Sequence, residues 1–171
     1  LYKQYLTGSS LFRDYIDGRK KISEVFDLPK IAKYAAIVDL LGASHALAGH
    51  NYRFYYNPVT SKLEPIGFDG NAGKKVYGFG RLYNSKEDIA FLEAYTKAVE
   101  EVTQDEYVQQ LSNWPGLKSM VELMQTIQGD YDWTDKMLIH NQKLLQGSIR
   151  PKQPLRVHFN GVENRRFEVS I

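Results

Sequence analysis

The stretch that decides the fold is residues 44–73, SHALAGHNYRFYYNPVTSKLEPIGFDGNAG. Its aromatic run alternates in the manner of a β-strand, and Asn57-Pro58 then predicts a turn of about five residues. Residues 63–68 form the expected return strand, which ends at Asp69 in a glycine-flanked loop. Polar groups at both open ends of such a hairpin converge in space, so the sequence predicts a functional site there.

The hairpin is expected to lie on helices. Pro65 cannot donate to a ladder, which favours a two-stranded ribbon, and two strands alone are only marginally stable in water. A helix from Asp27 to Gly42 has a cap, a proline in its first turn and apolar residues on more than one side, which predicts the buried central helix. A shorter helix is expected before it, over residues 9–17.

Four more helices are predicted after an irregular loop at residues 70–84. Capping boxes at Ser85 and Thr103 would open the first two. The third spans residues 115–128, with Leu117, Met120, Val121, Met124 and Ile127 inside. The fourth spans 134–146, is closed by Gly147 and has Asn141 on its inner face.

After Pro151 the residue pattern changes from helical periodicity to the alternation of β-strands. Residues 155–159 and 166–171 alternate like strands, and Asn160-Gly161 is a strong two-residue hairpin turn. The expected division is a mainly helical domain over residues 1–151, followed at 152–171 by a closing hairpin or the start of a β domain.

Composition excludes several classes of protein. The 171 residues carry 22 basic and 20 acidic side chains, a net charge of +2, so no polyanion partner such as nucleic acid is implied. There is no cysteine, which excludes disulfides and thiolate metal sites, and no apolar run approaches a membrane span. Because the chain opens at Leu1 without a signal peptide, we expect a part of a longer protein, and compartment and oligomeric state cannot be inferred.

Several common catalytic motifs are absent. The glycines at 70–80 lack phosphate-loop spacing, and no zinc motif is present. A triad of Ser44, His50 and Asp69 has no nucleophile elbow to support it.

The remaining candidates are Asn51 and Asp69, with His45 and His50 close in sequence. Amide and carboxylate oxygens suit Mg²⁺ carrying a phosphate substrate. Protein kinases place a metal-binding asparagine, a short hairpin, a metal-binding aspartate and a mobile segment in this same order. The structural alternative is that Asn51 makes a local bond at the strand start and Asp69 caps a turn.

The run from Ala35 to Gly73 resembles the CotH family, atypical protein kinases named after a spore-coat protein. The resemblance rests on His50-Asn51-Tyr52, the aromatic strand, Asn57-Pro58-Val59-Thr60, Leu63-Glu64-Pro65-Ile66 and Phe68-Asp69, and extends more loosely over residues 9–151. It implies an α+β, predominantly helical fold like a kinase C-lobe. It also implies Asn51 and Asp69 as Mg²⁺ ligands, ATP as phosphoryl donor to protein Ser or Thr, and an extracytoplasmic or cell-surface location.

The sequence departs from the family at two places. The usual catalytic aspartate, five residues before the asparagine, is Ala46 here, so His45 becomes the candidate base, or else a structural residue at a helix end. His50 is a supporting residue. The nucleotide-clamping N-lobe would precede Leu1, so this chain alone is expected to bind ATP poorly. A non-catalytic pseudokinase or surface adhesion module is the main alternative, and a metal-dependent hydrolase using His50 and Asp69 is a third.

Overall fold

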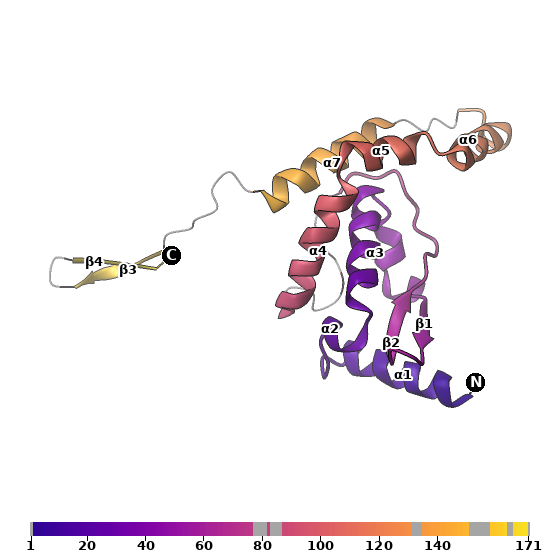
Figure 1. The fold of residues 1–171 in the computed structure, drawn as a ribbon. Coiled ribbons are helices and arrows are strands. Elements are labelled where there is room, and N and C mark those ends of the chain that lie inside the picture. Colours follow the sequence, from indigo (N-terminus) through magenta and orange to yellow (C-terminus); the bar gives the residue numbers. More distant parts are fainter. Residues whose placement is uncertain are drawn as a thin grey trace.

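The structure is a computed structural model that describes residues 2–76, 82, 87–130, 135–150, 158–163 and 166–170, the last two ranges as backbone. The fold is predominantly helical, with two small antiparallel sheets, as the sequence predicts (Figure 1). The α-helices are α1 (Tyr2–Ile16), α2 (Ile22–Val25), α3 (Leu28–Leu40), α4 (Ile89–Val102), α5 (Asp105–Ser112), α6 (Pro115–Ile127) and α7 (Asp135–Ile149). Two 3-10 helices, η1 (Ser44–Leu47) and η2 (Gly49–Asn51), lead into β1 (Phe54–Asn57) and β2 (Lys62–Pro65), and β3 (His158–Glu163) pairs with β4 (Arg166–Ser170).

Helix α3 is the buried centre of the fold, which confirms the prediction. The Asp27 carboxylate accepts the Lys30 N–H at 3.2 Å and caps its start. The helix packs mainly against α4 beside it, and also against α7 and β2 (Figure 1). It ends at Leu40, and the chain then turns at Gly42, whose φ of 59° is left-handed and whose hypothetical Cβ would lie 1.7 Å from the Lys74 carbonyl oxygen. Only glycine allows the chain to turn here with Lys74 so close.

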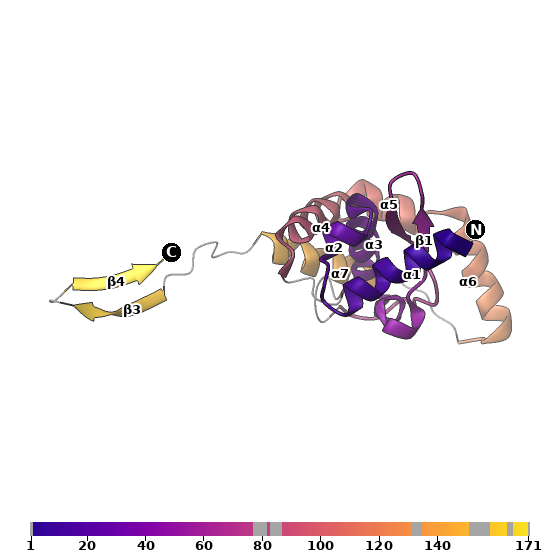
Figure 2. The same cartoon turned by 90° about the horizontal axis from the view of Figure 1, so that it is seen from below.

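The β1–β2 hairpin packs against α1 and α3, so the predicted ribbon on helices is confirmed. Figure 2 shows α1 beside β1. Phe54 pairs with Pro65 and Asn57 with Lys62. The Asn57 side-chain oxygen accepts the Val59 N–H at 2.9 Å and shapes the turn. The inner face of the hairpin joins an aromatic cluster of Phe12, Tyr15, Phe26, Tyr52 and Phe54.

The N-terminal region differs from the predictions in the start of its first helix and in the presence of a second, short helix. Helix α1 begins at Tyr2, well before the serine cap expected near Ser9, and it continues through Gly8. A Cβ at Gly8 would lie 3.0 Å from the Tyr56 Cβ, so the glycine lets α1 approach β1 closely. The single turn of α2 was not predicted, because four residues are too few for a periodic pattern.

The two helices predicted to begin at capping boxes have other residues at their cap positions. Helix α4 begins at Ile89 with Asp88 as its cap, whereas Ser85 lies outside the described residues. Thr103 ends α4 instead of opening α5, because its hydroxyl donates to the Val99 carbonyl at 2.7 Å. The cap position of α5 is Gln104.

Helix α6 occupies the predicted range, yet none of its residues is buried. Met120, Leu123 and Ile127 are exposed, so the prediction that Met120 and Ile127 lie inside is wrong. Helical periodicity identifies an apolar face, but it does not show that a partner element covers that face. Helix α7 runs past the predicted stop at Gly147 to Ile149, and it does bury Asn141.

The C-terminal hairpin forms, but not with the predicted turn. Asn160 and Gly161 lie inside β3, where the pairing register shifts between Phe159 and Gly161 as in a β-bulge. Residues 70–76 contain no helix or strand, as predicted, whereas most of 77–84 lies outside the described residues. None of the described helices is long and apolar enough to cross a membrane.

Candidate functional site

The hairpin brings Asn51 and Asp69 together. Asn51 ends η2 just before β1, and Asp69 follows β2 by four residues. The Asn51 Nδ2 atom lies 3.4 Å from the Asp69 Oδ2 atom. The two side chains predicted to act together are therefore neighbours, with the Asn51 NH₂ group facing the carboxylate.

Asn51 is buried, with 5% of its surface exposed, and its amide is held in one orientation. The Nδ2 atom donates to the backbone carbonyl of His45 at 3.0 Å. The Oδ1 atom accepts no hydrogen bond from another described residue. Because a buried acceptor without a partner is costly, this oxygen is suited to ligate a cation.

Asp69 differs from Asn51 in both exposure and backbone conformation. Its side chain is 52% exposed, so solvent and a ligand can reach the carboxylate. Its φ of 40° is left-handed, an unfavourable conformation for a residue with a Cβ. Gly70, which follows, fits against Ala43, since a Cβ there would lie 3.1 Å from the Ala43 Cβ.

His45 contacts both residues through the same ring nitrogen. Its Nδ1 atom lies 3.0 Å from Asn51 Nδ2, 3.2 Å from the Asp69 carbonyl oxygen and 3.3 Å from Asp69 Oδ2. When Nδ1 is unprotonated it accepts from the Asn51 amide, and when it is protonated it donates to Asp69. His45 can therefore hold or release a proton at the centre of the site.

His50 lies at the edge of this cluster. Its ring packs edge-on against that of His45, with centroids 5.3 Å apart, and its side chain is exposed. Among the described residues no contact joins the His50 ring to Asp69. The structure thus places His45, rather than His50, beside the carboxylate.

Three contacts of Arg53 next to the site were not predicted from the sequence. The Arg53 guanidinium donates to the carbonyls of His50 at 3.0 Å and Tyr52 at 2.9 Å, and it lies over the Phe68 ring at 4.5 Å. This stacked pair joins the segment that enters β1 to the segment that leaves β2, next to the site. The single arginine in an aromatic strand could have suggested a stacking contact. Its partner, Phe68, is distant in sequence and could not be identified.

The segment after Asp69 is tied to the helices by Asn141 of α7. This fully buried side chain accepts the Val76 N–H at 3.1 Å and donates to the carbonyls of Leu40 at 3.1 Å and Lys74 at 2.9 Å. The Gly73 N–H also donates to the Leu41 carbonyl at 2.8 Å. Asn141 therefore helps to fix the path of the chain that leaves Asp69.

The donor set suits one kind of metal and not another. Within the described part of the chain, no three His, Asp or Glu side chains are placed to hold an ion among themselves, as a zinc site needs. Mg²⁺ is commonly held by one or two protein oxygens together with water and phosphate. The Asp69 carboxylate and the Asn51 Oδ1 atom are oxygen donors of the type that this second pattern uses.

Comparison of the chain with protein-family models, with curated proteins and with solved structures gave no match.

Proposed function

We propose that this chain is the metal-binding part of a CotH-like protein kinase, which transfers phosphate from ATP to Ser or Thr of a protein. The observation that carries the proposal is the oriented Asn51 amide beside the Asp69 carboxylate, at the two open ends of one hairpin. Its support from sequence is the resemblance of residues 35–73 to that family, with the C-lobe-like fold that the resemblance implies.

Each residue of the site has a defined role in this proposal. The Asn51 Oδ1 atom and the Asp69 carboxylate would hold Mg²⁺, which neutralises phosphate charge and orients the transferred group. The hydrogen bond from Asn51 Nδ2 to the His45 carbonyl orients the amide, so less freedom is lost on binding. The Arg53–Phe68 pair stiffens the strand ends that carry the two ligands.

The transfer step needs a proton acceptor for the attacking hydroxyl. The hydroxyl oxygen bonds to the γ-phosphorus, the bond from that phosphorus to the ADP oxygen breaks, and the hydroxyl proton leaves. Ala46 is buried and has no proton-accepting group. The unprotonated Nδ1 atom of His45 accepts the proton, because it already lies within the site.

The buried Ala46 also favours a second candidate, a pseudokinase that binds the metal and nucleotide without transferring phosphate. In that case His45 has only the structural role of orienting Asn51. The two candidates share the metal site and differ only in chemistry.

Label transfer from γ-labelled ATP separates the two candidates. The full-length protein that contains this chain is incubated with Mg²⁺ and a generic protein acceptor. We expect labelled protein with the natural sequence, none with Asp69→Ala, and unchanged labelling with Asp130→Ala, which removes an exposed carboxylate elsewhere. Nucleotide binding that needs Asp69, without any label transfer, would establish the pseudokinase instead.

A further inference from the structure

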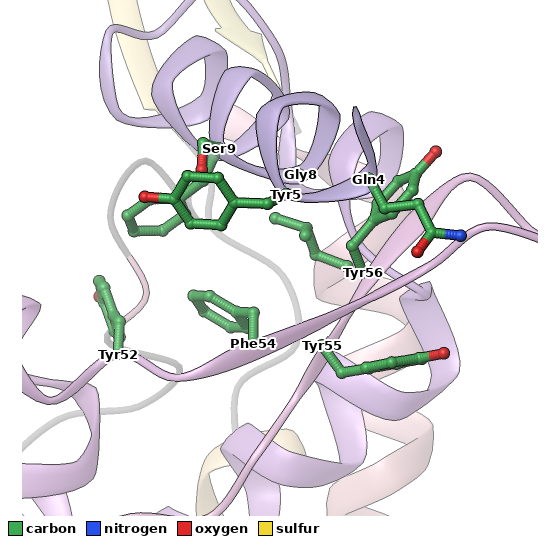
Figure 3. A pocket seen from close by; sticks show the side chains of 10 residues that line it. Gln4, Tyr5, Gly8, Ser9, Tyr52, Phe54, Tyr55 and Tyr56 are labelled. Carbon is green, nitrogen blue, oxygen red and sulfur yellow. The ribbon is translucent and has the colours of Figure 1, made fainter. Parts of the chain in front are cut away.

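Away from the Asn51–Asp69 site, a concave surface lies between α1 and β1, on the face of the hairpin that α1 covers. The cavity has a volume of about 350 Å³ and is lined mostly by aromatic rings (Figure 3). Tyr5 of α1 lies above it, and Phe54 and Tyr56 of β1 form the opposite wall. Its size is within the range of about 300–1,000 Å³ that ligand sites commonly have.

The cavity depends on the glycine in α1. Gly8 lies against the Tyr56 side chain, and a Cβ there would lie only 3.0 Å from the Tyr56 Cβ. The next helical turns on either side then present Tyr5 and Phe12 to the strand. A groove open at the surface results, since 68% of Tyr5 is exposed.

The lining is mostly apolar, and its polar groups are uncharged. None of the residues that line the cavity is acidic or basic. The hydroxyls of Tyr5 and Ser9 and the amide of Gln4 make no hydrogen bond to another described residue. These groups are available to donate to acceptors on an uncharged ligand.

We propose that this groove binds a neutral proline-rich peptide in the polyproline II conformation. Such a peptide offers flat prolyl rings to the aromatic walls, and its backbone carbonyls make no internal hydrogen bonds. The carbonyls accept from Tyr5, Ser9 and Gln4, while the rings cover Phe54 and Tyr56. Aromatic-lined grooves with hydroxyl donors recognise peptides of this kind because their extended conformation is formed before binding.

The absence of charge from the lining disfavours a charged peptide. An acidic or basic peptide would lose hydration in the groove and gain no ion pair there. This binding does not depend on phosphoryl transfer, because neither Asn51 nor Asp69 lines the cavity. The two proposals can therefore fail separately.

Fluorescence anisotropy with a labelled decaproline tests the proposal, with a labelled Gly-Ser decapeptide as the control ligand. We expect saturable binding of decaproline by this chain and none of the Gly-Ser peptide. Tyr5→Ala should weaken binding at least tenfold, because it removes a wall of the groove. Tyr2→Ala should change binding less than twofold, because Tyr2 is an equally exposed tyrosine of α1 outside the cavity.

A third variant separates the ring from the hydroxyl. Tyr5→Phe keeps the aromatic wall and removes one donor, so we expect an intermediate loss of about threefold to tenfold, for one neutral hydrogen bond. The far-ultraviolet circular dichroism of each variant should match the parent chain, since both tyrosines are exposed. Equal binding of both peptides, no binding of decaproline, or equal effects of Tyr2→Ala and Tyr5→Ala would overturn the proposal.

Discussion

Asp69 adopts a backbone conformation that costs free energy for any residue with a Cβ. With φ at 40°, alanine would be strained here by about 1 kcal/mol relative to glycine. We therefore expect Asp69→Gly to unfold at higher urea concentration than Asp69→Ala, although both lose the carboxylate. Equal stability of the two variants would mean that the left-handed conformation is not maintained in solution. Strain at a residue with a proposed chemical role is consistent with selection for function over stability.

Asp88 links α4 to the turn at α2 and should make stability depend on pH. Burial raises the pKa of its carboxyl group. The hydrogen bonds from Ser23 and from the Phe91 N–H, together with nearby Lys21, outweigh burial and bring the pKa below its ordinary 3.8. A lowered pKa in the folded state stabilises the fold above pH 3.8, and this contribution is lost as the pH falls through the folded value.

The corresponding experiment compares Asp88→Ala with the parent chain by urea unfolding. Near pH 7 we expect a loss of about 1 kcal/mol from the missing helix cap. The difference should shrink below pH 3.8, where the parent carboxylate becomes protonated. Asp130→Ala, at an exposed position, should show neither effect. A difference that stays constant from pH 7 to pH 2 would contradict this account.

At the scale of elements, α7 holds the segment after Asp69 through one side chain. Replacing Asn141 by leucine would leave the Val76 N–H and the carbonyls of Leu40 and Lys74 unpaired in the interior. We expect a loss of about 3 kcal/mol in unfolding free energy and faster hydrogen exchange at the Val76 amide. His140→Leu, on the exposed side of the same helix, should leave both values unchanged.

Helices α6 and α7 should contribute very differently to stability. Leu123 of α6 is 61% exposed, whereas Leu145 of α7 is fully buried. Leu145→Ala should therefore cost about 2–5 kcal/mol in unfolding free energy, and Leu123→Ala about 0.5 kcal/mol or less. A large loss from Leu123→Ala would show that the apolar face of α6 is covered in solution.

Helix boundaries were predictable where local chemistry decides them. The start of α3 follows from Asp27 and Pro29, and its end follows from Gly42, all within one segment. Thr103 was misassigned because its hydroxyl can serve either end of a helix, and here it bonds back to Val99. Asn160-Gly161 was misassigned for a similar reason, since a glycine that favours a turn also favours a bulge.

At the scale of the whole molecule, the hairpin explains why part of the site could be predicted. Antiparallel strands return the chain to its starting level, so Asn51 and Asp69 had to converge. Asn141 could not be assigned to the site from sequence, because it reaches Val76 across 65 positions and only tertiary packing joins them. The His45 contact with Asp69 depends on two short 3-10 turns that leave no periodic pattern.

The central claim is that Asn51 and Asp69 bind one divalent ion, and paramagnetic broadening tests it most directly. Mn²⁺ is titrated into the isotopically labelled chain, because it takes the same oxygen ligands as Mg²⁺. The account predicts that the side-chain amide signal of Asn51 and the backbone signals at Asp69 and Gly70 broaden first. This broadening should disappear in Asp69→Ala and persist in Asp130→Ala. Early broadening elsewhere with Asn51 unaffected, or an unchanged pattern in Asp69→Ala, would contradict it.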